Sequence, residues 1–217
     1  MFLFCPKDRT RYGMPMPAIG ITGGISTGKT TFVECLRELL PQASFFDADA
    51  VARQLVDVED VKRELREAFG SGIFSASDDL NRKALRAIVF QDAAQKGALE
   101  KILHPRIRQQ WSVEADKRRK SPEFFIADIP LLYETAGETL CDRVVVVACS
   151  PEIQLANLMR RANLERSDAE KMIAAQMPLE EKIKRADHVI WNNGDKSVLA
   201  DQSKSLVELW RQEKWTK

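Results

Sequence analysis

The sequence predicts an α/β protein whose parallel sheet is covered by helices on both faces. Short apolar segments of strand character alternate with segments of helical periodicity along the 217 residues. A glycine-rich stretch, GGISTGKT at 23–30, joins the first of these strands to the first helix. Acidic residues follow two later strands, at the edge where parallel sheets bind their ligands.

Five segments have the character of strands. The segment at 143–149, RVVVVAC, is an unbroken run of apolar and mostly β-branched residues after its first arginine, which indicates a strand buried on both faces. The segment at 43–49, ASFFDAD, ends in two acids. The predicted strands are 18–22, 43–49, 124–130, 143–149 and 188–192.

Helices are predicted between and after these strands. The region 81–119 is predicted to be helix-rich but interrupted at His104-Pro105, because proline disfavours a helical conformation in the residue before it. Ser167 and Glu170 have the spacing of a capping box at the start of a later helix. The other predicted helices are 29–40, 58–69, 151–161, 167–176 and 195–213.

Composition narrows the classes of function. The formal net charge of +1 favours neither a nucleic-acid nor a membrane partner, and no apolar run is long enough to span a bilayer. The four cysteines form no C-x-x-C pair, so reduced thiols and a cytoplasmic location are expected. Residues 1–16 fit no element and lack the apolar region of a secretory signal, so we expect a loose N-terminal extension.

The stretch at 23–30 matches G-x-x-x-x-G-K-[ST] in full. In this motif backbone N–H groups and a helix N-terminus cradle phosphates, the lysine reaches the β- and γ-phosphates, and the hydroxyl ligates Mg²⁺. A chance glycine-rich turn is the alternative, but the flanking strand and helix favour ATP with Mg²⁺. The predicted ATP-binding residues are Gly23, Gly24, Ile25, Ser26, Thr27, Gly28, Lys29, Thr30 and Thr31, and Thr30 is also a predicted metal ligand.

Carboxylates follow two strands on the side where an acceptor would bind. Asp47 and Asp49 would share one face of an extended strand, and an acid there can take a proton from an attacking hydroxyl. The alternative is that Asp49 caps a helix. Asp128 is placed like the acid that holds Mg²⁺ in nucleotide-binding proteins, or it is a satisfied carboxylate at the end of a strand.

Three further features permit two interpretations each. The apolar residues after Pro130 can line a substrate pocket or belong to the core. His104 is a ligand or a structural cap. Arg160 and Arg161 stand between two helices, where arginines can neutralise a transferring phosphoryl group or simply form a solvated face.

These pieces, in this order, resemble the dephospho-CoA kinase family. The resemblance rests on IGITGGISTGKTT, FFDADAVAR, LHPRI and PLLYE, then a lid arginine, AAQ at 174–176, Lys182 and ADHVIWNNG at 186–194. It covers roughly residues 18–213. The phosphate-loop motif alone indicates only a superfamily, whereas the ordered set is much more specific.

The resemblance implies a three-layer α/β/α P-loop NTPase fold over 17–217, with a five-stranded parallel sheet, a helical CoA-side insertion at about 55–120 and a lid at about 150–180. The implied reaction moves the γ-phosphoryl group of ATP to the ribose 3′-hydroxyl of dephospho-CoA, giving coenzyme A and ADP. A monomer acting on these small molecules is expected. The implied residues are Asp49 as general base, Lys29 at the phosphates, Arg161 as lid arginine, His104, Leu131, Leu132, Tyr133 and Glu134 at the acceptor, and Asn193 and Gly194 near adenine.

The chain also departs from the family pattern. Ser26 replaces a glycine common in the family's loop, Thr27 and Thr30 replace serines, and Trp191 is unusually bulky for its strand. A kinase for another small acceptor, such as a nucleoside monophosphate or shikimate, is the near alternative. A nucleotide switch acting on a protein is the distant one, although the N-K-x-D guanine signature of a GTPase does not occur.

Overall fold

The computed structural model describes residues 18–118, 123–213 and 215, and the predicted extension at 1–16 lies outside this part of the chain. The protein divides into two compact units. One contains the chain up to Phe46 together with the chain from Glu114 onward, and the other is Asp47–Val113.

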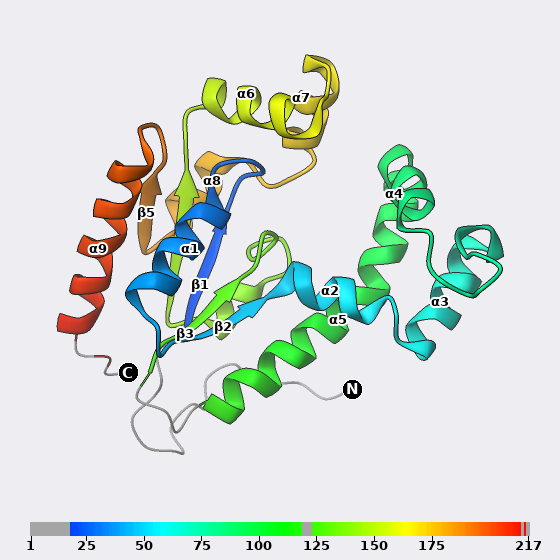
Figure 1. Ribbon diagram of the computed structural model, residues 1–217, viewed down its shortest axis with the longest axis horizontal. Helices are drawn as coiled ribbons and strands as arrows, with labels where there is room; N and C mark the ends of the chain where they lie inside the picture. Colours follow the sequence, from blue (N-terminus) through cyan, green and yellow to red (C-terminus); the bar gives the residue numbers. More distant parts are fainter. Residues whose placement is uncertain (1–17, 119–122, 214, 216–217) are drawn as a thin grey trace. The chain divides into compact units, whose positions relative to one another are not determined.

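The first unit is built on a five-stranded sheet, as the sequence predicts (Figure 1). The strand order is β2-β3-β1-β4-β5, so the first strand is central. It pairs in parallel with β3 and β4, and β4 pairs in parallel with β5. The strands are β1 (Ala18–Gly23), β2 (Ser44–Asp47), β3 (Phe125–Asp128), β4 (Arg143–Ala148) and β5 (His188–Trp191).

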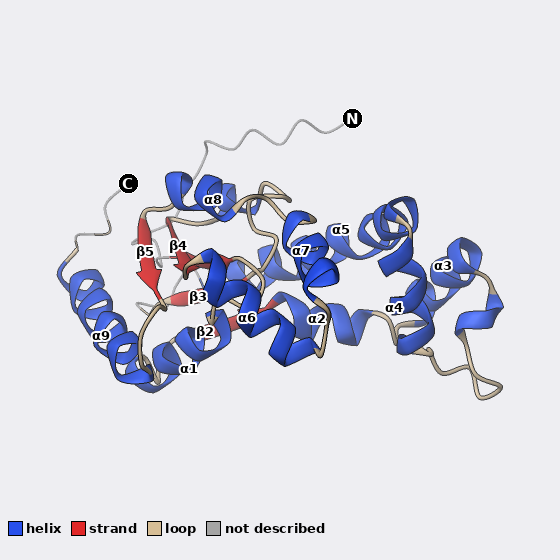
Figure 2. Ribbon diagram, turned by 90° about the horizontal axis from the view of Figure 1, so that it is seen from above, coloured by secondary structure: helices blue, strands red, loops and turns tan. Residues whose placement is uncertain are grey.

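Helices cover both faces of this sheet, which confirms the three-layer α/β/α architecture. Helices α1 (Lys29–Leu39) and α9 (Lys196–Gln212) lie on one face, and α8 (Leu179–Arg185) lies on the other (Figure 2). The short helix α8 has no counterpart among the predicted elements, because its seven residues are too few to show a clear apolar period.

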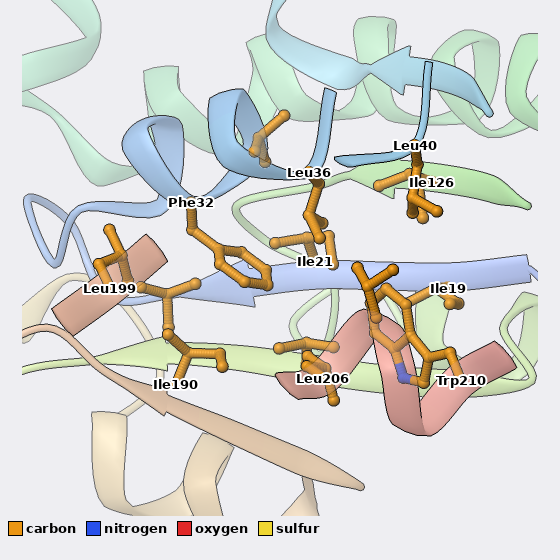
Figure 3. Packing of buried hydrophobic residues seen from close by; sticks show 14 residues of the cluster. Ile19, Ile21, Phe32, Leu36, Leu40, Ile126, Ile190, Leu199, Leu206 and Trp210 are labelled. Carbon is orange, nitrogen blue, oxygen red and sulfur yellow. The ribbon is translucent and has the colours of Figure 1, made fainter. Parts of the chain in front are cut away.

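The core lies between the sheet and the α1–α9 layer. Phe32 and Leu36 of α1 are fully buried with Ile21 of β1, and Trp210 of α9 belongs to the same cluster (Figure 3). Burying each such side chain contributes about 1.5–3 kcal/mol. The valines of β4 are buried without interruption, which confirms the prediction that this strand is covered on both faces.

Two helices follow β4 in the region predicted as a lid, α6 (Pro151–Ala162) and α7 (Arg166–Ala174). Ser150 caps α6 by accepting a bond from the Ile153 N–H. The predicted capping box of α7 is wrong, because the helix begins before Ser167. Glu170 instead accepts a 2.8 Å bond from Arg166, one helical turn away.

The second unit is helical. It contains α2 (Ala48–Leu55), α3 (Glu59–Phe69), α4 (Arg82–Gln91) and the first part of α5 (Ala93–Arg118), together with a short 3₁₀ turn, η1 (Ser71–Ile73). A second 3₁₀ turn, η2 (Gly137–Leu140), belongs to the first unit. The core of the helical unit is a separate apolar cluster of Leu55, Val56, Val61, Leu65, Ile73, Leu85 and Leu103.

The predicted strand at 43–49 ends earlier than expected. Strand β2 stops at Asp47, whose side chain accepts a 2.9 Å bond from the Ala50 N–H and so caps α2. Asp49 therefore lies in the first turn of a helix, and the prediction that both acids share one face of a strand is wrong. The alternative prediction, that Asp49 caps a helix, is wrong as well, because Asp47 is the capping residue of α2.

The predicted interruption at His104-Pro105 is also wrong, because α5 runs through it for 26 residues. Proline removes one backbone donor and disfavours, without forbidding, a helical residue before it. Arg106 stabilises this turn. One guanidinium nitrogen donates to the Ile102 carbonyl at 2.7 Å and the other to Glu64 at 2.7 Å.

Candidate active site

The stretch at 23–30 forms a tight loop between β1 and α1. Ser26 and Gly28 have positive φ angles of 60° and 95°, and the hydroxyl of Thr27 donates to the Gly24 carbonyl at 2.9 Å. Gly28 occupies the cap position of α1 and has no side chain to bond the first-turn N–H groups. Such a turn binds anions through its N–H groups and the positive end of the helix dipole.

Side chains from the lid region hold the middle of this loop. Gln154 of α6 donates to the Ile25 carbonyl at 2.9 Å, and Asn157 donates to the Ser26 carbonyl at 3.5 Å. The Ile25 N–H donates in turn to the side chain of Gln176 at 3.0 Å. None of these amides was assigned a role from the sequence, although Gln176 lies in the AAQ motif.

Asn192 fixes the end of the same loop. Its amide donates to the Thr27 carbonyl at 3.0 Å and lies against Gly28. A Cβ atom at Gly28 would lie well inside van der Waals distance of this amide nitrogen, so glycine is required both by the φ angle and by the space. Asn192 belongs to the ADHVIWNNG motif but was also missed.

Lys29 and Asp128 form an ion pair at the carboxyl end of the parallel strands. The parallel register places Ile21 of β1 beside Asp128 of β3, and Lys29 follows β1 by one loop. Both side chains are mostly buried, with exposed fractions of 15% and 16%. The lysine predicted for the phosphates and the acid predicted for Mg²⁺ are therefore in direct contact.

The two residues predicted as metal ligands have side-chain oxygens of the type that binds Mg²⁺. The Thr30 hydroxyl and the Asp128 carboxylate are hard oxygen ligands, and Mg²⁺ typically takes its remaining ligands from substrate phosphates and water. Within residues 18–118 and 123–213, no three histidines, cysteines or acids gather into a self-sufficient metal site.

The segment after β3, which was predicted to line a substrate pocket or to belong to the core, is largely buried. Leu132 is fully buried and Tyr133 nearly so, with the Arg185 guanidinium 4.3 Å from the centre of the tyrosine ring. Burial raises the pKa of Tyr133 to about 12. The packing supports the core interpretation for Leu132, and contact of Leu131 or Tyr133 with an acceptor stays a prediction.

Glu134 has two polar partners within the first unit. Its carboxylate pairs with the ammonium group of Lys182 at 2.8 Å and accepts the Met177 N–H at 3.0 Å. The Lys182 side chain has no exposed surface, and its ammonium group also donates to the carbonyls of Gly23 and Pro130. A buried lysine next to the phosphate loop was not foreseen, although Lys182 is one of the residues on which the resemblance rests.

Three other predicted residues lie at the ends of elements of the first unit. Arg161 is exposed in the last turn of α6. Asn193 accepts the Ser150 N–H at 2.8 Å, which ties the turn after β5 to the start of α6, and Gly194 follows it in the same exposed turn. Their roles toward phosphate and adenine stay predictions.

Asp49 and His104 belong to the helical unit. Asp49 is exposed in the first turn of α2, where the helix dipole favours a negative charge. His104 is half-buried in the middle of α5, so a role as cap of a broken helix is excluded. Their roles toward a substrate stay predictions.

A family model and the curated relatives give the same family. The family model described as dephospho-CoA kinase matches residues 17–197. The dephospho-CoA kinase of Geobacillus kaustophilus is 40% identical over 195 residues, covering 88% of this chain and 96% of the relative.

Two solved structures are similar over nearly their whole length. The crystal structure of TT1252 from Thermus thermophilus has a TM-score of 0.75 and 31% identity, covering 93% of this chain and 100% of that one. The dephospho-CoA kinase from Campylobacter jejuni has a TM-score of 0.67 and 27% identity, covering 88% of this chain and 95% of that one.

Proposed function

The chain belongs to the dephospho-CoA kinase family and is a kinase, and we propose that it transfers the γ-phosphoryl group of ATP to the ribose 3′-hydroxyl of dephospho-CoA. The products are coenzyme A and ADP. The observation that carries the proposal is the Lys29–Asp128 ion pair at the end of a complete phosphate loop. It occurs in a member of the dephospho-CoA kinase family.

At the nucleotide, the loop N–H groups and the start of α1 bind the phosphates. Lys29 donates to the β- and γ-phosphate oxygens. Asp128 and Thr30 would hold Mg²⁺, which would neutralise phosphate charge. Asn193 and Gly194 contact the adenine, and Thr31 bonds the α-phosphate.

At the acceptor, Asp49 accepts the proton of the attacking hydroxyl and Arg161 neutralises charge on the phosphoryl group during transfer. Both side chains are exposed, so substrate can reach them without repacking the core. His104, Leu131, Tyr133 and Glu134 bind the acceptor. Positioning and charge neutralisation then account for the rate, with no covalent intermediate on the protein.

The first experiment measures ADP release from ATP and Mg²⁺ with dephospho-CoA, AMP, CMP or shikimate in separate reactions. Stimulation by dephospho-CoA alone, with coenzyme A as product, is expected. Stimulation by another acceptor would reassign the substrate. Equal ADP release in every reaction would favour a nucleotide switch that acts on a protein.

The proton-accepting role of Asp49 is tested by Asp49→Asn, which keeps the shape of the side chain. We expect kcat to fall about 10²–10⁴-fold, the usual contribution of general acid–base catalysis, while ATP still binds. Asp57→Asn is the matched control, because Asp57 is an exposed acid of the same unit paired with Arg82. Unchanged turnover in Asp49→Asn would remove the base assignment.

We also propose that the protein works as a monomer in the cytoplasm. Among the described residues, no helix combines the length and the apolar character needed to cross a membrane. Cys35, Cys141 and Cys149 are free thiols, as expected in a reducing compartment. Burial raises the pKa of Cys149 to about 11, which keeps this thiol protonated and unreactive.

A further inference from the structure

We propose that Lys182 is a positioning residue for phosphoryl transfer. Its buried ammonium group, together with Glu134, fixes the start of the phosphate loop relative to the segment that follows Asp128. The inference rests on the proposed function for its kinetic readout, but its contacts are independent of the identity of the acceptor.

The ammonium group of Lys182 has three partners within the first unit, two carbonyls that accept hydrogen bonds and one carboxylate in an ion pair. They are the Gly23 carbonyl at 3.2 Å, the Pro130 carbonyl at 3.1 Å and a Glu134 carboxylate oxygen at 2.8 Å. Because the side chain has no exposed surface and these three groups surround its ammonium group, Lys182 does not itself bind a phosphate. It acts through the groups that it holds.

Each acceptor belongs to a part of the candidate site. Gly23 is the first residue of the phosphate loop, and Pro130 follows Asp128 by two residues. The Pro130 carbonyl also accepts the Thr22 hydroxyl at 2.9 Å. One buried cation therefore fixes the two chain segments from which Lys29 and Asp128 extend.

Glu134 extends the same network toward the lid region. Its carboxylate accepts the Met177 N–H, and the neighbouring Gln176 accepts the Ile25 N–H of the phosphate loop. The connection between α7 and α8 is thus bonded both to the phosphate loop and to the acceptor-side segment. A displacement of Glu134 would therefore shift both the phosphate loop and the segment that follows Asp128.

Stability alone is a weak reason for such an arrangement. Removing an ammonium group and a carboxylate from water costs about as much as their attraction returns, so a well-packed apolar pair would serve a core equally well. The directional bonds to two carbonyls are what an apolar side chain cannot provide. Their geometry favours a role in holding the loop.

The test compares Lys182→Met with Lys184→Met. Lys184 lies on the same helix but is exposed, and its ammonium group pairs with Glu181 at 2.7 Å across one turn. Both changes therefore remove a lysine charge from α8 and leave one carboxylate without its ion-pair partner. Thermal unfolding and circular dichroism define temperatures at which each variant is fully folded, and kcat, KM for ATP and ATP affinity by calorimetry are measured there.

We expect Lys182→Met to lower kcat roughly 10–100-fold and to weaken ATP binding, because small displacements of reacting groups have effects of this size. Lys184→Met should stay within about twofold of the parent protein. Equal kcat and ATP affinity in the two folded variants would overturn the proposal.

A second variant covers failure of Lys182→Met to fold. Glu134→Gln retains an oxygen for the Met177 N–H and removes only the charge, and we expect kcat to fall roughly tenfold. An unchanged kcat and ATP affinity in Glu134→Gln would then overturn the proposal. If the parent protein binds ATP but does not phosphorylate dephospho-CoA, the proposed function fails while the ATP affinities still decide the role of Lys182.

Discussion

The phosphate loop and the helical unit hold their backbones in opposite ways. Around the loop, polar side chains of Gln154, Gln176, Lys182 and Asn192 bond individual carbonyl and N–H groups. In the helical unit, the helices bond their own backbones, the loop between Ile73 and Asn81 bonds its backbone groups to one another, and an apolar cluster packs the helices together. Polar side chains there form ion pairs that are largely exposed, such as Arg82–Asp57.

The difference follows from the backbone itself. A helix satisfies its own interior N–H and C=O groups, so only burial of its apolar side is needed to place it. A loop with positive φ angles has no such ladder and needs partners from elsewhere. Directional polar contacts therefore concentrate where a backbone must be shaped for a ligand.

The largest stability effect is expected from the core of the helical unit. Leu65→Ala removes a fully buried side chain and should cost about 2–5 kcal/mol of unfolding free energy, measured by urea denaturation. Arg82→Ala in the same unit is the control and should cost about 0–1 kcal/mol, because its ion pair is exposed. Similar losses in the two variants would contradict the view that burial holds this unit.

Two glycines with positive φ angles sharpen the comparison between the regions. Gly70 ends α3 with φ 79° and ψ 168°, a conformation almost confined to glycine, and has open space where a Cβ atom would lie, so Gly70→Ala should cost only backbone strain of about 1–3 kcal/mol. Gly28→Ala adds a clash with Asn192 that breaks its bond to Thr27, a further loss of about 1 kcal/mol.

Unfolding free energy and ATP affinity measure this difference. Gly28→Ala should weaken ATP binding, whereas Gly70→Ala should leave it unchanged. Equal effects of the two alanines on both quantities would show that Asn192 yields freely and that the loop is not held by it.

Ser26→Gly should stabilise the protein by about 1 kcal/mol. Ser26 has a φ angle of 60°, and its buried hydroxyl finds no hydrogen-bond partner among the described residues. Removing the strain and the unsatisfied group outweighs the added entropy of glycine in the unfolded chain. Chemical denaturation measures the change, and a loss of stability would indicate that the hydroxyl is satisfied after all.

Tyr133→Phe is expected to have the smallest effect on stability near neutral pH. The unfolding free energy should rise by up to about 1 kcal/mol, because the buried hydroxyl of Tyr133 has no hydrogen-bond partner among the described residues. The pKa of Tyr133 is about 12 in the folded protein and about 10 when unfolded, so ionisation of the unfolded chain lowers wild-type stability as pH rises from 10 to 12. The advantage of the phenylalanine variant should therefore grow above pH 10.

Denaturation of both proteins from pH 8 to 11 measures this dependence. A constant difference across the series would mean that the folded and unfolded pKa values of Tyr133 are alike. Lower stability of Tyr133→Phe at pH 8 would mean that the hydroxyl has a partner in solution.

The sequence by itself determined the features that depend on neighbouring residues. The phosphate-loop motif, the buried valine strand β4 and the alternation of strands and helices are local patterns, and each appears in the structure. The same holds for the helix predicted at 58–69, which ends before Gly70 in the structure, because glycine readily adopts the positive φ angle that stops a helix. The ordered motifs were also sufficient to indicate the family.

Tertiary structure decided the features that depend on distant partners. Asp47 ends β2 by capping α2, and the turn at Pro105 stays helical with Arg106 bonded to Ile102 and Glu64. The loop contacts join residues as far apart as Asn192 and Thr27, separated by 165 positions. No local pattern reports such a pairing, because the bond exists only after the sheet has brought β5 beside β4 and the loop beside both.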